Sequence, residues 1–503
     1  MDKKKSILNV SVSVIFRLAT IFASILVRRT LIHSCGNDVN GLNSLYLSII
    51  GFLAIAELGV GTAIAFCMYR PIVQGDHEKV SALYHLFRKL YLLIGGVILI
   101  GGLAITPFLH YLAKDYGQLD INLYSTFVLM LVSIVITYLF GAELSLINAY
   151  KNNYITTAIT SSGVLLQYVL QIVVLTVTGS YHGYLICRIV AALAQWLVTR
   201  TIAGKRYAFI LKTKSRIDDG TKQELTKSIR AMFMHKIGIL LVNTVDSVVI
   251  AAFVGVVALG NYTNYTVIQS SMDGLIRLVF ASLTSIFGHL YVQKNKETVR
   301  QYCEAFHMLN FAIGAVFYLG YYAVADSLVA MFFSRELVAE RMISQVITMN
   351  GFVQFMRYST ISFRDATGTF YYDRWKPLIE GIVNIVLSVF LVNRIGVVGV
   401  IAATILTNLL ICHIVEPYVL YRYALSASPI KHYLRNYGMI VLFWAEINVF
   451  DRLMKPMEPG MWAFWRNGFA SVGVSLVLCL VVLLVDYRKS KALLSMLIKR
   501  RRK

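Results

Sequence analysis

The sequence predicts an all-α integral membrane protein of about fourteen transmembrane helices, with two six-helix lobes around a central cavity and two extra helices. Composition is the first reason: of 503 residues, 57% are hydrophobic and only 15% are charged. The second is the length of the apolar runs, about 20 residues, which suits a helix that crosses a bilayer. An open sheet is excluded because lipid cannot satisfy its backbone hydrogen bonds. The third reason is an internal repeat.

The predicted helices follow one another along the whole chain. Their approximate limits are 8–31, 44–68, 91–113, 121–147, 154–178, 182–204, 229–254, 258–291, 303–332, 341–363, 377–394, 396–420, 434–450 and 464–486. The eighth is too long for one perpendicular crossing, so we expect it to tilt, kink or project into water. The first is too long for a signal-peptide core and lacks a small-residue cleavage site, which favours a retained helix.

The distribution of lysine and arginine predicts the orientation. With the amino terminus inside, the inner segments carry 33 of these residues, the outer segments 9 and the spans 6. Since basic residues concentrate on the cytoplasmic side, both termini are predicted to be cytoplasmic. The net charge of +22 then reflects topology rather than nucleic-acid binding. Segments 76–90 and 491–503 suit helices lying on an anionic leaflet, with a solvated charged face as an equal alternative.

The two halves of the chain resemble each other. A shift of 219 residues pairs Gly36 with Gly255, Gly41 with Gly260, Tyr46 with Tyr265 and Ile49 with Ile268. Six intervening spans keep the copies in the same orientation, as in transporters whose substrate site lies between parallel repeats. The predicted parts are an amino-terminal lobe (1–204), a cytoplasmic linker (205–228), a carboxy-terminal lobe (229–420), helices 13 and 14 (421–486) and a basic cytoplasmic tail (487–503).

An arginine lies in the middle of the first predicted helix. A guanidinium at membrane depth costs at least about 2.5–3.5 kcal/mol, so Arg17 should face protein or water rather than lipid. Ser13, Thr20, Ser24 and Arg28 recur with it at steps of three or four. This spacing places all five side chains on one helix face. The stripe predicts contact with an anionic ligand.

The second half repeats this pattern of polar residues. The same shift sets Arg17 on Lys236 and Ser24 on Asn243, in the seventh predicted helix. Asp246 lies about 80° from that line at 100° per residue, where it could pair with Lys236 through water or bind a separate cation.

Further polar residues occupy the eighth, second and fourth predicted helices. Gln269, Asp273 and Arg277 follow one another at steps of four. Asp273 and Arg277 have the spacing of a self-neutralised pair, and a ligand contact is an equal alternative. Glu57 and Glu143 either couple transport to a cation or neutralise an arginine on a neighbouring helix.

Deep basic residues outnumber deep acids, which predicts a net cationic cavity that attracts anions. The bases are Arg17, Arg188, Arg200, Lys236, Arg277 and Arg357. The acids are Glu57, Glu143, Asp246 and Asp273.

Enzymatic motifs are lacking from the sequence. It contains no GxxxxGK[ST] phosphate loop, no HExxH and no GxSxG. The ten histidines are dispersed, and the six cysteines form no CxxC pair. We therefore predict no catalytic residue, no metal site and no cofactor other than a coupling cation.

Short motifs in both halves resemble one known family. They are Glu57–Ala63 (ELGVGTA), Arg29 with Gly36 and Gly41–Asn43, Arg364 with Gly368 and Trp375–Ile379, and Gly396–Thr404. Over nearly its whole length the chain resembles the bacterial oligosaccharide-lipid flippases of the Wzx type. These form a branch of the multidrug/oligosaccharidyl-lipid/polysaccharide exporter superfamily.

The resemblance implies two lobes that alternate between inward-open and outward-open states in the bacterial cytoplasmic membrane. It implies an undecaprenyl-diphosphate-linked glycan as substrate, for a surface polysaccharide such as O-antigen, capsule or exopolysaccharide. Related lipid II flippases engage the diphosphate through arginines on helices 1 and 8, and Arg17 and Arg277 stand at matching positions. Implied partners are membrane lipids, a polysaccharide polymerase and glycosyltransferases. The coupling cation, proton or sodium, stays open, with Glu57 as one candidate site.

Three functions are weighed. A flippase for the lipid-linked glycan would hold the diphosphate with Arg17, Lys236 and Arg277, and touch phosphate or sugar with Arg28, Asn243 and Gln269. A cation-coupled multidrug exporter predicts an acidic cavity, against which the excess of bases argues. A membrane-embedded polymerase or glycosyltransferase usually needs a sizeable catalytic loop, whereas the longest outer connections here have about fifteen residues.

Overall fold

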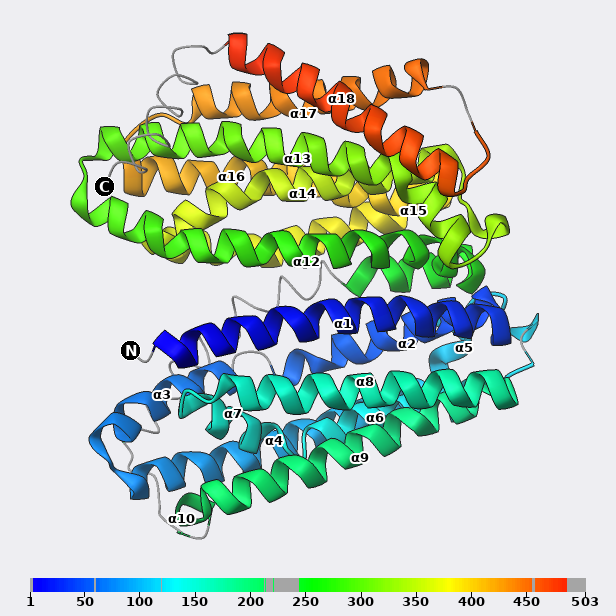
Figure 1. Cartoon of the computed structure of the whole chain (residues 1–503), viewed down its shortest axis with the longest axis vertical. Helices are drawn as coiled ribbons and strands as arrows, with labels where there is room; N and C mark the ends of the chain where they lie inside the picture. The colour runs from blue at the N-terminus through cyan, green and yellow to red at the C-terminus, as the bar shows by residue number, and fades with distance from the viewer. Residues whose placement is uncertain are drawn as a thin grey trace. The chain divides into compact units, whose positions relative to one another are not determined.

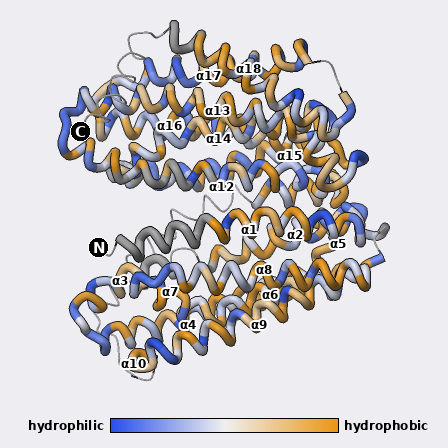
Figure 2. Tube along the Cα trace, viewed as in Figure 1, coloured by the Kyte–Doolittle hydropathy of each residue, from blue (hydrophilic) through white to orange (hydrophobic). Residues whose placement is uncertain are grey.

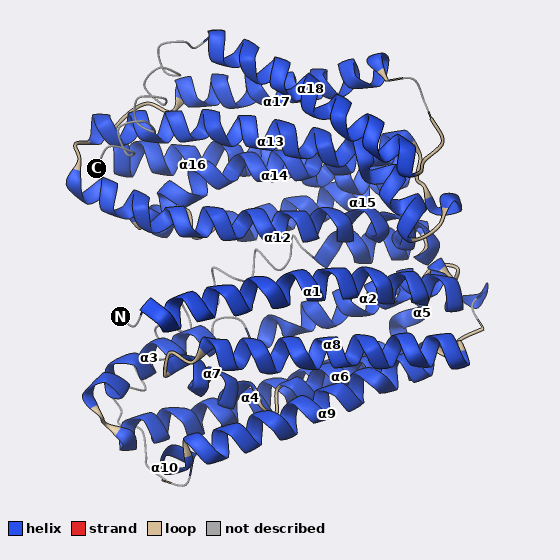
Figure 3. Ribbon diagram, in the orientation of Figure 1, coloured by secondary structure: helices blue, strands red, loops and turns tan. Residues whose placement is uncertain are grey.

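The computed structural model describes residues 3–57, 60–118, 120–211, 213, 220, 244–454 and 457–485. Over these ranges it consists of helices and loops without a strand (Figure 3). The predicted all-α membrane class is therefore confirmed. The packing of the helices separates two compact units, residues 1–260 and 261–503. The predicted linker at 205–228 lies mostly outside the described residues.

In the unit 1–260, long helices pack in sequence against one another (Figure 1). Helix α1 (Lys3–Cys35) packs on α8 (Asn153–Thr178), α8 on α9 (Tyr181–Arg206), and α9 on α6 (Leu123–Thr137). The other helices of this unit are α2 (Asn37–Leu53), α3 (Val60–Gln74), α4 (His77–Ile105), α5 (Leu109–Leu112), α7 (Gly141–Ala149) and α10 (Ala208–Leu211). Residues 244–249 are also helical.

Two predicted spans of this unit are interrupted. The span 44–68 breaks where α2 ends at Leu53 and a short 3-10 turn, Ala54–Glu57, precedes α3. The span 121–147 breaks at a turn between α6 and α7. Apolar residues run through both breaks, so the hydrophobic pattern of the sequence does not reveal the breaks. Figure 2 shows hydrophobic residues along most helices and hydrophilic residues at turns such as that between α3 and α4.

The unit 261–503 contains the rest of the long helix α12 (Val256–Gln293), whose 38 residues agree with the expected over-long eighth span. Helix α13 (Lys296–Phe332) packs against α14 (Arg341–Thr367) and α18 (Met461–Val485). The other helices are α15 (Lys376–Thr407), α16 (His413–Val419) and α17 (Ile430–Leu453). Helix α15 is kinked at Ile395 and Gly396, between the predicted spans 377–394 and 396–420.

Seven segments of the described chain are long and apolar enough to cross a membrane. They are His77–Leu112, Leu123–Ala149, Asn153–Thr178, Tyr181–Arg206, Lys296–Phe332, Lys376–Leu425 and Met461–Leu480. The sixth contains two predicted spans, so these segments account for eight of the fourteen. The others are interrupted, more polar, or partly outside the described residues.

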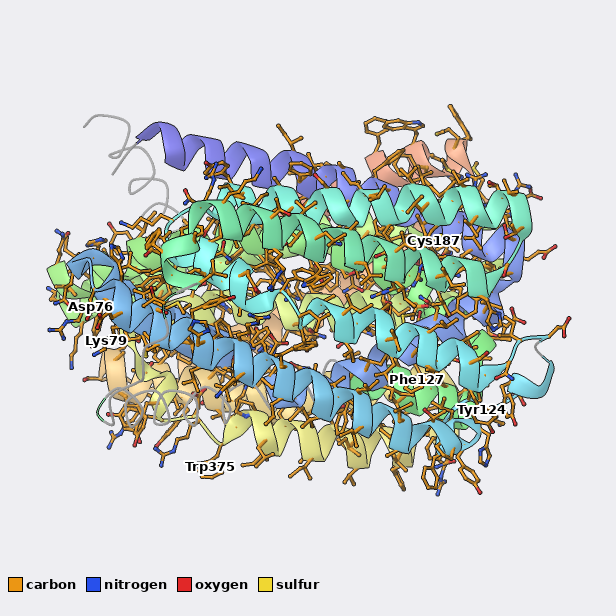
Figure 4. All side chains as sticks on the ribbon, turned by 90° about the horizontal axis from the view of Figure 1, so that it is seen from below. Asp76, Lys79, Tyr124, Phe127, Cys187 and Trp375 are labelled. Carbon is orange, nitrogen blue, oxygen red and sulfur yellow. The ribbon has the colours of Figure 1, made fainter. Side chains whose placement is uncertain are left out.

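The stretch 76–90 is continuous with a span. It forms the first half of α4, and the side chain of Asp76 caps the helix by accepting a hydrogen bond from the backbone N–H of Lys79 at 2.9 Å (Figure 4). The segment 76–90 therefore continues into the predicted third span and is not a separate helix.

The internal repeat is visible in the backbone. Helices α2 and α12 both begin directly after a glycine with positive φ, Gly36 at 96° and Gly255 at 137°. Such values strain any residue with a Cβ, which explains glycine at both repeat positions.

Within the unit 1–260, residues at equivalent repeat positions contact each other reciprocally. A Cβ on Gly41 would lie 1.8 Å from the carbonyl oxygen of Val256, and one on Gly260 would lie 2.4 Å from that of Asn37. Asn37 and Val256 are themselves separated by the 219-residue shift. The pairs therefore exchange equivalent contacts, and each needs a residue without a side chain.

We predict that Gly41→Ala lowers stability. The backbone of Val256 cannot yield as a side chain could, so overpacking should cost about 1–3 kcal/mol. Gly96→Ala is the matched control, because no atom lies within 4 Å of its added Cβ in the interior of α4. Thermal unfolding of the purified proteins in detergent should show a lower midpoint for Gly41→Ala alone. Equal midpoints for the two variants would contradict the close contact.

Candidate functional site

Arg17 presents its guanidinium on the surface of α1. The side chain is exposed, and its backbone carbonyl accepts a hydrogen bond from the Thr20 hydroxyl at 2.9 Å. No ion pair of Arg17 occurs within the described parts of the chain. The Ser24 hydroxyl likewise bonds to its own helix, at the carbonyl of Ile21. Arg17 is thus exposed, while the hydroxyls of Thr20 and Ser24 are satisfied within the helix.

Arg28 has a different environment on the same helix. It is partly buried and donates a hydrogen bond to the Ser44 hydroxyl of α2 at 3.4 Å. The hydroxyls of Tyr168 and Tyr184 lie within its electrostatic range. Eleven residues separate it from Arg17, which is about 16 Å along a helix axis. The two backbone positions are thus about three helical turns apart.

Asp273 and Arg277 each contact a different tyrosine. The Asp273 carboxylate accepts a hydrogen bond from the Tyr318 hydroxyl of α13 at 2.6 Å. The Arg277 guanidinium lies 5.7 Å from the centre of the Tyr358 ring of α14, a cation–π contact, and its side chain is exposed. Among the described residues Arg277 forms no ion pair. Tyrosines thus separate the acid from the base, leaving the arginine available to a ligand.

Gln269 lies inside the unit 261–503. It is buried, and its amide nitrogen would be 1.8 Å from a Cβ placed on Gly351 of α14. The structure therefore gives Gln269 a packing role between α12 and α14 rather than an exposed amide. Lys236 and Asn243 lie outside the described residues, and Asp246 is buried in the unit 1–260.

Glu57 is held by two tyrosines. Its two carboxylate oxygens accept hydrogen bonds from the hydroxyls of Tyr91 at 2.7 Å and Tyr138 at 2.8 Å. Tyr91 belongs to α4, and Tyr138 follows the last residue of α6, so the carboxylate joins three segments at the breaks in the second and fourth spans. No basic side chain within the described ranges forms an ion pair with it. The sequence suggests an arginine or a coupling cation as the partner of Glu57, whereas its hydrogen-bond donors in the structure are tyrosine hydroxyls.

Glu143 is similar and more deeply buried. One carboxylate oxygen accepts a hydrogen bond from the Tyr84 hydroxyl at 2.9 Å, while the other has no hydrogen-bond partner among the described residues. Its exposed fraction is 1%. A buried carboxylate with a free oxygen is a place where a proton or a cation gains a contact.

The unit 261–503 contains a buried charge network: Arg357, Arg364, Asp373, Lys376, Glu380 and Glu416. Its centre is Glu416 of α16, which accepts from Arg357 at 2.6 Å and from Lys376 at 2.6 Å. Glu380 lies 3.1 Å from Lys376 and 3.6 Å from Arg357. Three bases therefore face three acids, and the network compensates its own charge.

The network changes the expected charge of the site. Arg357 belongs to the deep bases that the sequence assigns to a cationic cavity, yet its guanidinium is bound by Glu416 and by the Asn408 amide oxygen at 2.5 Å. The sequence does not identify Glu380 and Glu416 as members of this network, because they lie near the ends of predicted spans and 36 residues apart. The lysine–glutamate spacing of Lys376 and Glu380 is the one local signal for the network.

The fold is shared with solved membrane transporters. A lipid II flippase, MurJ, in an inward closed conformation aligns with a TM-score of 0.66 and 15% identity over 96% of this chain and 99% of that chain. An inward-facing multidrug transporter of the MATE family aligns with a TM-score of 0.61 and 14% identity over 85% and 98%. The chain has the fold of the MOP superfamily.

Other comparisons agree with this fold or find nothing. A MATE transporter from Vibrio cholerae, VcmN, aligns with a TM-score of 0.54 and 13% identity over 89% of this chain and 99% of that chain. These neighbours are transporters and a flippase, not enzymes. No protein-family model matches the sequence, and no curated protein does.

We predict that Glu416→Gln strongly destabilises the protein. Removing one acid leaves Arg357 and Lys376 with excess buried positive charge, a loss of about 3–5 kcal/mol. Asp365→Asn is the control: this carboxylate also binds an arginine, Arg364, at 3.2 Å, but its side chain is 46% exposed. Its loss should cost less than about 1 kcal/mol. The readouts are the thermal midpoint and the yield of folded protein, and similar values for both variants would contradict a structural network.

Proposed function

We propose that this protein is a flippase that moves an undecaprenyl-diphosphate-linked oligosaccharide from the inner to the outer leaflet by alternating access, for surface polysaccharide synthesis. One observation carries the proposal. Arg17 and Arg277 expose their guanidinium groups on α1 and α12, which the sequence predicts to span the membrane, and neither forms an ion pair within the described chain. The lipid II flippase among the structural neighbours supports a lipid-linked substrate.

A diphosphate suits these two groups chemically. A guanidinium is planar, always charged and able to bind two phosphate oxygens at once. It costs at least about 2.5–3.5 kcal/mol at membrane depth, and a bound dianionic group offsets that cost. We assign the diphosphate to Arg17 and Arg277 together with Lys236. Arg28, about 16 Å from Arg17 along the helix, then reaches the glycan, as does Asn243.

Coupling and cellular context belong to the same proposal. Glu57 and Glu143, held by tyrosine hydroxyls, are the candidate sites for a coupling proton or sodium ion. The protein would lie in the bacterial cytoplasmic membrane with both termini in the cytoplasm. It would receive its substrate from glycosyltransferases and deliver it to a polysaccharide polymerase.

A second candidate is a cation-coupled multidrug exporter, since MATE transporters share the fold. Export of cationic drugs needs acids that face the substrate. In the described chain Glu57 and Asp273 accept hydrogen bonds from tyrosines, and Glu416 is bound by arginine and lysine. Resistance profiles of cells with and without the protein separate the two functions, because only an exporter raises drug tolerance.

We predict that Arg17→Ala and Arg277→Ala each slow flipping by roughly tenfold or more, the loss expected for one phosphate-bound guanidinium. The assay reconstitutes the protein in liposomes with a labelled lipid-linked oligosaccharide and measures its access to the opposite leaflet. Arg17→Lys should give an intermediate rate, because ammonium keeps the charge without the fork. Arg394→Ala is the control, an exposed arginine stacked on the Phe390 ring.

Unchanged rates for Arg17→Ala and Arg277→Ala, at equal amounts of reconstituted protein, would remove the diphosphate assignment. Flipping of a lipid phosphate without a glycan at the same rate would instead show that the sugar contributes nothing.

A further inference from the structure

The loop between α14 and α15 is anchored on the side that faces the protein interior. Asp373 is buried and accepts a hydrogen bond from Arg364 at 2.6 Å. Its backbone carbonyl accepts a hydrogen bond from the N–H of Lys376 at 2.9 Å. Arg364 and Lys376 both belong to the buried charge network, so their hydrogen bonds to Asp373 anchor the loop to that network.

The exposed side of this loop carries an aromatic platform, which consists of Tyr371, Tyr372, Trp375 and, from the segment Leu420–Leu425, Tyr423. These side chains are 47–61% exposed. Tyr372 and Tyr423 stack with their ring centres 3.9 Å apart and their planes 2° from parallel. Figure 4 shows Trp375 projecting away from the start of α15.

The platform adjoins an apolar surface. Ile379, Ile382 and Val386 of α15 are each more than half exposed, at steps of three and four that place them on one helix face. In a membrane-spanning helix such a face meets lipid chains. The platform therefore stands where the hydrocarbon ends and the head groups begin, the level at which tryptophan and tyrosine concentrate.

Exposed positive charge accompanies the rings. The Arg374 guanidinium lies 4.6 Å from the centre of the Tyr371 ring, and Arg422 precedes Tyr423 with its side chain exposed. Of the two acids close by in sequence, Asp373 is buried in its pair with Arg364 and Asp365 binds the same arginine. The outward-facing charge of the platform is thus positive.

We propose that the aromatic platform, with Arg374 and Arg422, is a binding site for an anionic phospholipid. The chains would lie along the exposed face of α15, the glycerol region against the rings, and the phosphate between the two guanidinium groups. The sequence places this loop on the cytoplasmic side, whose leaflet is rich in anionic lipid. The alternative ligand is a glycan, but a glycan would gain no favourable contact from the adjoining apolar face. The inference is independent of the transported solute.

The test measures phosphatidylglycerol bound to the purified, delipidated full chain by native mass spectrometry, with phosphatidylcholine as the reference lipid. Arg374→Ala/Arg422→Ala should weaken phosphatidylglycerol binding about tenfold or more, since each surface arginine contributes about fivefold. Trp375→Leu, which keeps both charges, should weaken binding of both lipids. Arg394→Ala is the matched control, because its guanidinium also covers a ring, that of Phe390, at the other end of the same helical segment.

Three results would overturn the proposal. One is unchanged phosphatidylglycerol binding in the double variant when its elution and thermal midpoint match the wild type. Another is an equal loss with Arg394→Ala, which would show that any exposed arginine suffices. The third is displacement of phosphatidylglycerol by a soluble oligosaccharide without a lipid chain, which would assign the platform to a glycan. Loss of transport without loss of lipid binding would bear on the proposed function alone.

Discussion

The cost of placing charge at membrane depth determines how this protein satisfies its ionisable side chains. A buried carboxylate needs hydrogen-bond donors or a cation, because lipid supplies neither. The chain uses tyrosine hydroxyls as donors repeatedly: Tyr91 and Tyr138 for Glu57, Tyr84 for Glu143, Tyr318 for Asp273, Tyr265 for Asp326 and Tyr322 for Asp451. Six of the 30 tyrosines of the sequence thus have a chemical use beyond packing.

A neutral donor has a consequence that a cation does not. When Tyr318 satisfies Asp273, Arg277 one turn away keeps its full charge available. If the two had paired instead, the guanidinium would have to break an ion pair before it could bind phosphate. Glu57 is likewise satisfied by tyrosine hydroxyls, so it needs no arginine partner at the breaks of the two helices. At Glu57 and Asp273, tyrosine hydroxyls thus take the place of a basic partner within the described residues.

The parts that follow from the sequence are those with a periodic or compositional signal. Helix class, the over-long eighth span, the break at Gly396 and the glycines at 36 and 255 all depend on local pattern. The donors to Glu57 could not be predicted, because tyrosine in an apolar helix reads as packing and its partners lie 34 and 81 residues away. The buried charge network escaped for the same reason. Its members gather only when α14, α15 and α16 fold together.

The unit 261–503 holds its acids in two ways, because Glu416 is bound by Arg357 and Lys376 whereas Asp273 accepts a hydrogen bond from Tyr318. Protonating Glu416 would leave Arg357 and Lys376 facing one acid fewer, so the network resists the change. Glu143 accepts a hydrogen bond from Tyr84 and forms no ion pair within the described residues. Carboxylates held by tyrosine hydroxyls therefore occur in both units, Glu57 and Glu143 in the unit 1–260 and Asp273 in the unit 261–503.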